Sequence, residues 1–191
     1  MTTLLVIGGG SHVGVFAIQV AKMIGVGRIV AVAGKGPENE LRGMGATDVV
    51  DRHAKDVLSQ VRAIVGDDLQ FAIDTVNSRA RSQVLAVAVL SNSMRGTLVT
   101  LLPPDPDSKN FTVEEIGPKT TGYESKFVPG SSNFHPQFAA EFWKNLPAMI
   151  KEGSLPPSEF GVIEGLDEDK VNKVLDRYAK DEEKVKVVIH P

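Results

Sequence analysis

The sequence predicts an α/β protein built on a doubly wound, parallel β-sheet flanked by helices. Three observations support this class. A buried apolar run, Leu4 to Ile7, passes through a glycine-rich turn into a segment with helical periodicity. Short β-branched runs then alternate with helical patterns over short connections, as in parallel sheets. The chain has 191 residues, 42% of them hydrophobic, which is enough for one sizeable core.

The glycine-rich turn includes Gly9 and Gly10. The dinucleotide fingerprint G-x-G-x-x-G, placed to end on Gly14, has Ser11 where its middle glycine would stand. Glycines let the backbone approach an anion closely, and the first N–H groups of a helix point toward it. The turn therefore predicts a pyrophosphate site, in which His12 either donates to a phosphate or faces solvent. The alternative is a strand-to-helix turn that binds no ligand.

The remaining elements follow from periodicity. The first helix is expected from apolar residues three and four positions apart, namely Val13, Phe16, Ala17, Val20, Ala21 and Ile24. Further strands are predicted at 28–32, 48–51, 69–73 and 96–102, and helices at 37–44, 54–65 and 78–90. With right-handed crossovers the strand order would be 3-2-1-4-5. The ligand crevice would then lie at the carboxyl ends of the first and fourth strands.

The end of the second strand bears on the choice of cofactor. An acidic residue there holds the free ribose of NAD, whereas a small or basic environment admits the 2′-phosphate of NADP. The sequence at this point is Ala33-Gly34-Lys35-Gly36, with no carboxylate. This favours NADPH over NADH. The alternative is that Lys35 is an ordinary solvated lysine.

Periodicity disappears between 103 and 136, a stretch rich in Pro, Gly, Ser and Asp. A sixth strand is expected near 112–116 or 120–127. A helix over 138–150 follows, then a strand at 161–163, a helix over 167–180 and a strand at 185–189. We therefore expect a dinucleotide-binding domain over 1–158 and a C-terminal helix-strand extension over 159–191.

Composition excludes several classes of function. A net charge of −3 with interspersed signs gives no footprint for nucleic acid or membrane. The sequence has no cysteine, and its four histidines lack ligand spacing, so no metal site is expected. The N-terminus has no signal-peptide pattern, which predicts a cytoplasmic location. Tyr123 and Lys126 are one residue too close for the Tyr-x-x-x-Lys pair of short-chain dehydrogenases, and the acidic residue that methyltransferases place after the second strand is absent.

Several stretches in order resemble the medium-chain dehydrogenase/reductase superfamily. Residues 4–22 (LLVIGGGSHVGVFAIQVAK) look like the opening of its cofactor domain, and 41–51 (LRGMGATDVVD) are similar to its L-x-x-x-G-A-D-x-V-x-D stretch. The resemblance continues through 71–76, 96–99 and 184–189, so it covers essentially the whole chain. This alcohol dehydrogenase-like superfamily has zinc-independent members, which include quinone oxidoreductases and fungal trans-acting enoyl reductases.

The resemblance implies a Rossmann fold and a set of cofactor contacts. Backbone contacts to the pyrophosphate come from Ser11, His12, Val13 and Gly14. Gly34 and Lys35 lie beside the adenosine ribose and its 2′-phosphate, Val76 lies beneath the cofactor, and Leu101 and Leu102 lie near the nicotinamide. NADPH-using relatives commonly have a tyrosine after the third strand's aspartate, where this chain has Arg52. An arginine could pair with the 2′-phosphate through charge-assisted hydrogen bonds, or it could be a surface residue.

Members of the superfamily place a GroES-like catalytic domain ahead of the cofactor domain, and we expect this chain to lack it. Residues 159–191, which in relatives return to that domain, would then expose apolar area. Two alternative functions remain open. The first is the NADP(H)-binding domain of a zinc-independent oxidoreductase that transfers hydride to an enoyl, quinone or carbonyl substrate, contacted through a catalytic domain outside this chain. The second is an inactive or truncated nucleotide-binding or scaffold protein. The resemblance also points to a homodimer formed through the segment from Phe111 to Val128.

Overall fold

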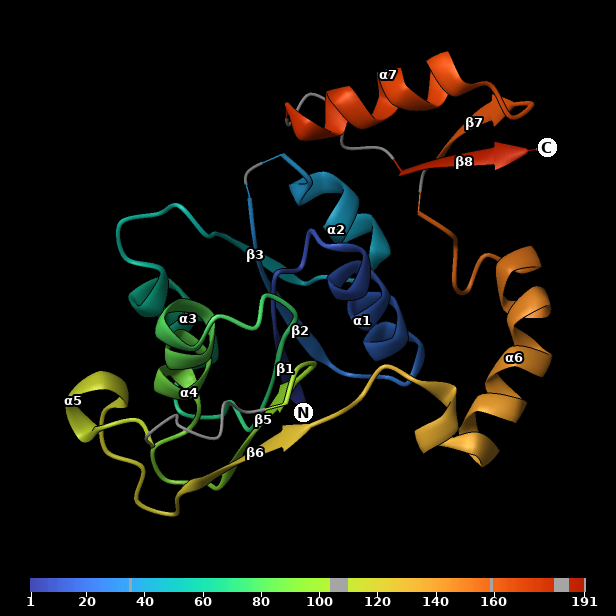
Figure 1. The fold of residues 1–191 in the computed structure, drawn as a ribbon. Coiled ribbons are helices and arrows are strands. Elements are labelled where there is room, and N and C mark those ends of the chain that lie inside the picture. The colour runs from blue at the N-terminus through green and yellow to red at the C-terminus, as the bar shows by residue number, and fades with distance from the viewer. Residues whose placement is uncertain (35, 104–109, 159, 181–185, 191) are drawn as a thin grey trace. The chain divides into compact units, whose positions relative to one another are not determined.

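The computed structural model describes residues 1–34, 36–103, 110–158, 160–180 and 186–190. It divides into two compact units, Met1–Leu155 and Pro156–Pro191 (Figure 1). The division into domains of 1–158 and 159–191 stays a prediction. The first unit contains a six-stranded sheet of order β3-β2-β1-β4-β5-β6, in which all neighbouring strands are parallel.

The elements of the first unit alternate along the chain. Its strands are β1 (Thr3–Ile7), β2 (Arg28–Ala33), β3 (Asp48–Asp51), β4 (Phe71–Asp74), β5 (Gly96–Thr100) and β6 (Tyr123–Phe127). Its helices are α1 (His12–Met23), α2 (Glu38–Met44), α3 (Val57–Val65), the π-helix η1 (Arg79–Gln83), α4 (Val84–Val89), α5 (Val113–Ile116), the 3-10 helix η2 (Ser132–Phe134) and α6 (Pro136–Lys151). The predicted fold class and the order of the first five strands are confirmed.

The sixth strand lies in the second of its two predicted places, because 113–116 forms the short helix α5 instead. Thr112 caps that helix, and Glu115 completes a capping box. In the sheet order β6 stands at the outer end, beside β5. The homodimer predicted for the surrounding segment stays a prediction.

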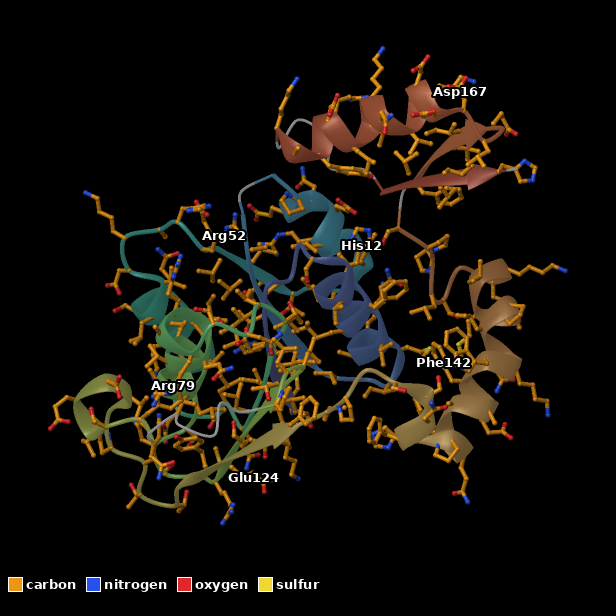
Figure 2. The ribbon with its side chains drawn as sticks, viewed as in Figure 1. His12, Arg52, Arg79, Glu124, Phe142 and Asp167 are labelled. Carbon is orange, nitrogen blue, oxygen red and sulfur yellow. The ribbon has the colours of Figure 1, made fainter. Side chains whose placement is uncertain are left out.

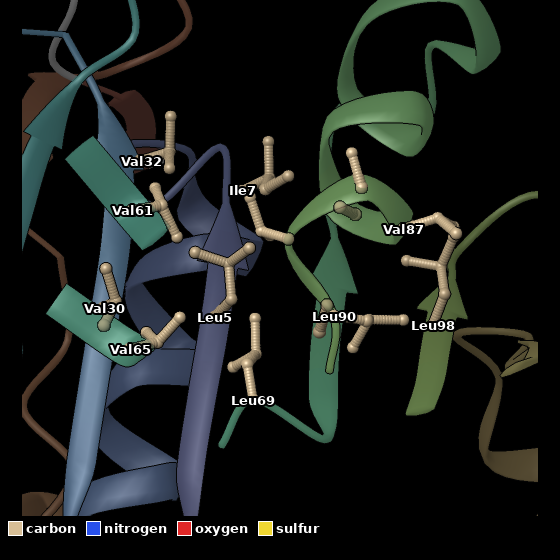
Figure 3. Close-up of a cluster of buried hydrophobic side chains, with 14 of the residues drawn as sticks. Leu5, Ile7, Val30, Val32, Val61, Val65, Leu69, Val87, Leu90 and Leu98 are labelled. Carbon is tan, nitrogen blue, oxygen red and sulfur yellow. The ribbon is translucent and has the colours of Figure 1, made fainter. Parts of the chain in front are cut away.

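The core consists of two apolar clusters, one on each face of the sheet. Alternate residues of a strand point to opposite faces, so Leu5 and Ile7 belong to one cluster and Val6 to the other. The first cluster packs under α3 and α4, through residues such as Val61 and Val87 (Figure 3). The second packs under α1 and α2. Both faces are therefore covered, as a parallel sheet requires.

The buried side of α1 differs from the predicted apolar stripe. Its buried residues are Gly14, Val15, Ile18, Gln19 and Ala21, whereas Val13, Phe16 and Ile24 are exposed. The cause is Gly14, since a Cβ there would collide with the Gly8 carbonyl oxygen. This close approach turns Gly14 and the residues four and seven positions later toward the sheet. The stripe at Val13 and Phe16 is consequently left on the outer side.

Two other helices depart from their predicted form. The helix predicted over 54–65 begins at Val57, because the Asp56 carboxylate accepts from the backbone N–H of Ser59 and caps the helix there. The helix predicted over 78–90 begins as the π-helix η1 and continues as α4. Ser82 lies in η1 and donates its hydroxyl to Asp74, a contact that ties this irregular turn to the end of β4.

The second unit is a small parallel βαβ arrangement. It consists of β7 (Phe160–Glu164), α7 (Glu168–Ala179) and β8 (Lys186–His190). The Tyr178 hydroxyl of α7 accepts from the backbone N–H of Val187 at 3.0 Å, which joins the helix to β8. Phe160, Val162 and Val188 remain largely exposed on the strands. The apolar surface expected for this extension is therefore present.

A polar cluster occupies the loops at the amino ends of β4, β5 and β6. Arg62 Nη2 and Lys119 Nζ donate to the same three oxygens, those of the Ala88 and Leu90 carbonyls and the Asn92 side chain. The distances are 2.8, 3.0 and 3.1 Å from Arg62, and 3.1, 2.7 and 2.9 Å from Lys119. These carbonyls lie at the C-terminal end of α4, where cations are favoured. Burial, reinforced by the charge of Arg62, lowers the pKa of Lys119 to about 8.

Asp67 completes this cluster. Its carboxylate accepts from the backbone N–H of Asn92 at 2.6 Å, from the Ser93 hydroxyl at 2.6 Å and from Arg62 Nη1 at 3.4 Å. The hydrogen bonds from Asn92 and Ser93 hold the pKa of Asp67 far below its usual value. The amino edge of the sheet is thus fixed by charged side chains whose partners lie within the fold.

Gln19 is the buried polar residue of α1 that lacks a full set of partners. It is 2% exposed, and its Nε2 lies 3.3 Å from the sulfur of Met44. Its Oε1 has no hydrogen-bond partner among the residues that the structure describes. Burying an unpaired acceptor costs stability.

We expect Gln19→Met to raise the free energy of unfolding by about 1 kcal/mol, because the apolar side chain of similar length removes the unpaired oxygen. Urea denaturation followed by circular dichroism measures the change. Gln60→Met, at an exposed position of α3, is the matched control and should change stability by less than about 0.5 kcal/mol. Destabilisation by Gln19→Met would mean that Oε1 has a partner in solution.

We also expect Asp67→Asn to destabilise the protein at pH 6 and to lose that effect in acid. A carboxyl group whose pKa is lowered in the folded state contributes its full stabilisation above the ordinary pKa of 3.8 and loses it as the pH falls further. The gap between wild type and variant should therefore narrow below pH 3.8 in urea denaturations at several pH values. Asp68→Asn makes the same charge change at the next residue, which is exposed, and should change stability by less than about 0.5 kcal/mol. An equal pH dependence in both variants would contradict the assignment.

Candidate cofactor site

The glycine turn between β1 and α1 is held by its neighbours on both sides. The backbone N–H groups of Gly8 and Gly9 both donate to the Val32 carbonyl of β2 at 3.0 Å. On the other side, the Thr75 hydroxyl donates to the carbonyls of Ile7 at 2.9 Å and Gly8 at 3.1 Å. Gly8 has a φ of 80°, and a Cβ there would collide with Thr75. The first glycine is therefore required by the turn itself.

Ser11 explains why the middle fingerprint position is not glycine. It is the N-cap of α1, and its Oγ accepts from the backbone N–H of Gly14 at 3.0 Å. The same Oγ lies 3.0 Å from Thr75 Oγ1, so the cap is joined to the end of β4. His12 and Val13, the first residues of the helix, are exposed, and Figure 2 labels His12 at this end of α1. Their N–H groups have no acceptor one turn back in the helix.

The predicted adenosine end lies at the carboxyl ends of β2 and β3. Ala33 pairs with Asp51, and the backbone N–H of Arg52 donates to the Ala33 carbonyl at 2.7 Å. Arg52 is therefore brought next to Gly34, which follows Ala33. The Arg52 side chain is exposed, and its Nε donates to His53 Nε2 at 3.0 Å (Figure 2). Lys35 lies outside the described residues.

The end of β4 is organised by a buried carboxylate. Asp74 is fully buried and accepts from the backbone N–H groups of Val76 at 2.9 Å and Asn77 at 3.1 Å, and from the Ser82 hydroxyl at 2.8 Å. Burial raises the pKa of Asp74, and these hydrogen bonds partly oppose the rise. The resulting turn leaves the side chain of Val76 more than half exposed at the edge of the sheet.

Leu101 and Leu102 follow the last residue of β5. Their backbone N–H groups both donate to Asn77 Oδ1, at 2.9 and 3.3 Å. Asn77 and Thr75 were not among the residues predicted for the site. Asparagine is one of the few residues that tolerate a left-handed turn, and its place three residues after the end of β4 could have drawn attention to Asn77.

The structure thus brings the predicted residues into two neighbouring groups at the carboxyl edge of the sheet. The turn 8–14, Val76 and the Leu101-Leu102 pair follow β1, β4 and β5, while Gly34 and Arg52 follow β2 and β3. The strand order reverses between β1 and β4, which is where open α/β sheets bind their ligands. Their individual roles stay predictions.

The described residues lack two features. They contain no group of three or more His, Asp or Glu residues that could hold a metal ion, and the sequence has no cysteine. No helix among them is both long enough and apolar enough to cross a bilayer.

Comparison with known proteins gives relatives of enoyl-reductase type. The chain is 25% identical over 169 residues to the trans-enoyl reductase ACTTS2 of Alternaria alternata, covering 85% of this chain and 47% of that protein. It is 24% identical over 157 residues to the dual trans-enoyl reductase/FAD-dependent monooxygenase tazHJ of Aspergillus terreus, covering 80% of this chain and 22% of that protein. The chain therefore spans less than half the length of these curated relatives.

A solved mycobacterial structure, that of Rv1454c complexed with NADPH, has the same fold. It superposes with a TM-score of 0.69 at 19% identity, over 100% of this chain and 56% of that one. The family model described as zinc-binding dehydrogenase matches residues 13–125, from the start of α1 to the middle of β6. The predicted kinship with the medium-chain dehydrogenase/reductase superfamily is confirmed. Because the family match takes in more than half of the sequence, the chain belongs to the zinc-binding dehydrogenase family.

Proposed function

We propose that this chain is the NADP(H)-binding domain of a zinc-independent oxidoreductase that transfers hydride to an enoyl, quinone or carbonyl group. The observation that carries the proposal is the convergence of the glycine turn, the start of α1 and the end of β4 at the switch point of the sheet. When bound, the nicotinamide supplies the hydride. The protein binds and orients the cofactor.

The turn fits a pyrophosphate. The N–H groups of His12 and Val13 lie in the first turn of α1, where the helix dipole favours negative charge. The backbone at Gly10 is exposed, and a Cβ there would come no closer than 3.4 Å to the nearest side-chain atom, that of Pro37. Phosphate oxygens can therefore approach the outer side of the turn without displacing a side chain.

Three features support NADPH over NADH. Gly34 brings no carboxylate to the end of β2, Arg52 is held beside it, and the sequence adds Lys35. Arginine pairs with a phosphate through charge-assisted hydrogen bonds, whereas the free ribose of NADH offers no such partner. The solved mycobacterial relative was captured with NADPH.

An enoyl acceptor has support from the two fungal relatives, which are both named trans-enoyl reductases. This chain itself offers zinc no thiolate ligand, because its sequence has no cysteine. At the nicotinamide end the chain presents Val76, Leu101 and Leu102, which can exclude water and orient an apolar ring edge.

The alternative is a nucleotide-binding module that does not itself turn over substrate. It is favoured by the same apolar side chains and by Asp74, the acidic residue nearest to Val76 in sequence, which is buried and has its oxygens engaged by two N–H groups and a hydroxyl. An assay of NADPH oxidation with enoyl, quinone and carbonyl acceptors separates the two functions. Acceptor-dependent oxidation by the isolated chain would exclude the inactive module.

We expect the wild-type chain to bind NADPH more tightly than NADH in isothermal titration calorimetry, and Arg52→Ala to reduce that preference. Hydrogen bonds to charged groups contribute about 1.5–3 kcal/mol, so the affinity for NADPH should fall by roughly 10- to 100-fold while that for NADH is unchanged. Lys35→Ala should act in the same direction.

Arg95→Ala is the matched control for this titration. It removes one exposed arginine from the amino edge of the sheet, just before β5, and should leave the preference for NADPH intact. Equal losses of NADPH and NADH affinity in Arg52→Ala would contradict a 2′-phosphate contact. Failure of the wild type to bind either cofactor would overturn the proposed function itself.

A further inference from the structure

One side chain joins the ends of β4 and β5. The backbone pairing of these strands ends at Asp74 and Thr100. Beyond that point Asn77 Oδ1 accepts from the backbone N–H groups of Leu101 and Leu102, at 2.9 and 3.3 Å. The amide of Asn77 therefore continues the connection between the two strands after the sheet itself has ended.

The backbone of Asn77 has an unusual conformation that aims this side chain. Its φ is 58°, and it is the non-glycine residue with a positive φ in the described part of the chain. Asp74 holds it there by accepting from its N–H at 3.1 Å, and Ser82 in turn donates to Asp74. Glycine would adopt this conformation more readily. Asparagine at this position adds an acceptor that glycine lacks, and the acceptor is used twice.

The segments that Asn77 joins carry the apolar side chains at this end of the crevice. Val76 is 53% exposed on one side of Asn77, and Leu102 is 59% exposed on the segment that its amide holds. Neither exposed side chain is fixed by burial. The spacing between them depends on the backbone. The backbone of the second segment is held by the two hydrogen bonds to Asn77 and by one from the Thr100 hydroxyl to the Leu102 carbonyl at 3.1 Å.

We infer that Asn77 is a positioning residue, which sets Leu101 and Leu102 against Val76 as a preformed wall for the nicotinamide half of the cofactor. This inference rests on the proposed function. Asn77 acts by holding the backbone of Leu101 and Leu102. Because this segment is already ordered, cofactor binding loses less conformational entropy. Its loss should weaken contacts to the nicotinamide half and leave the adenosine half, held by the turn 8–14 and the ends of β2 and β3, unaffected.

The test compares Asn77→Gly with Asn77→Asp. Glycine keeps the positive φ and removes the acceptor, whereas aspartate keeps acceptor oxygens in the same place. Amide hydrogen exchange followed by NMR reports the two bridging hydrogen bonds directly. Calorimetry measures the affinity for NADPH and for 2′,5′-ADP, a fragment that has the adenosine half without the nicotinamide.

In Asn77→Gly we expect exchange at the Leu101 and Leu102 amides to accelerate and the affinity for NADPH to fall about tenfold, equivalent to about 1.4 kcal/mol. The affinity for 2′,5′-ADP should stay within about twofold. In Asn77→Asp, protection of the Leu101 and Leu102 amides and the ratio of the affinities for NADPH and 2′,5′-ADP should both remain as in the wild type. Thr120→Val, which removes a 2.7 Å hydrogen bond between loops at the opposite edge of the sheet, is the control and should change neither readout.

Unchanged exchange at both amides in Asn77→Gly would overturn the inference, because the bridge would then not exist in solution. Faster exchange with an unchanged affinity ratio, or an equal loss of both ligands, would reduce Asn77 to a structural role and overturn it as well. If the wild type binds 2′,5′-ADP and NADPH with equal affinity, this inference fails while the cofactor site stands. If the wild type binds neither NADPH, NADH nor the fragment, the proposed function fails and this inference fails with it.

Discussion

The close approach of Gly14 to the Gly8 carbonyl is the contact on which the arrangement of this domain depends. A side chain at Gly14 would occupy the space of that carbonyl, so only glycine lets α1 begin this near to the end of β1. The contact fixes the rotation of α1, and with it the set of residues that pack on the sheet. It also directs the first N–H groups of the helix toward the carboxyl edge, where Thr75 and Val32 hold the turn from both sides.

The two edges of the sheet are stabilised by different means. At the amino edge, Arg62, Lys119 and Asp67 have their charges engaged by carbonyls, hydroxyls and one another. At the carboxyl edge, small polar side chains such as Ser11 and Thr75 bond to backbone groups and leave helix N–H groups facing outward. The second edge is better suited to ligand binding. The N–H groups at the start of α1 are held in place there and have no acceptor within the helix.

The strands and their order could be predicted from the sequence because buried parallel strands appear as short β-branched runs, such as Arg28–Ala33, and crossovers have one hand. The buried face of α1 could not be predicted from the sequence. Apolar residues surround much of that helix, so periodicity alone does not choose between the row containing Phe16 and the row containing Ile18. The close contact of Gly14 with the Gly8 carbonyl decides it, and hydrophobic periodicity does not register that contact.

The candidate site divides in the same way. The turn 8–14 could be recognised because its chemistry lies in consecutive residues. The bridge from Asn77 to Leu101 and Leu102 spans more than twenty positions and exists only because β4 and β5 are adjacent. Two backbone N–H groups that donate to one asparagine leave no periodicity in either segment. The proposed pyrophosphate turn could therefore be read from the sequence. The geometry of the proposed nicotinamide end is set by the adjacency of β4 and β5 and by the buried carboxylate of Asp74, which accepts from the N–H of Asn77.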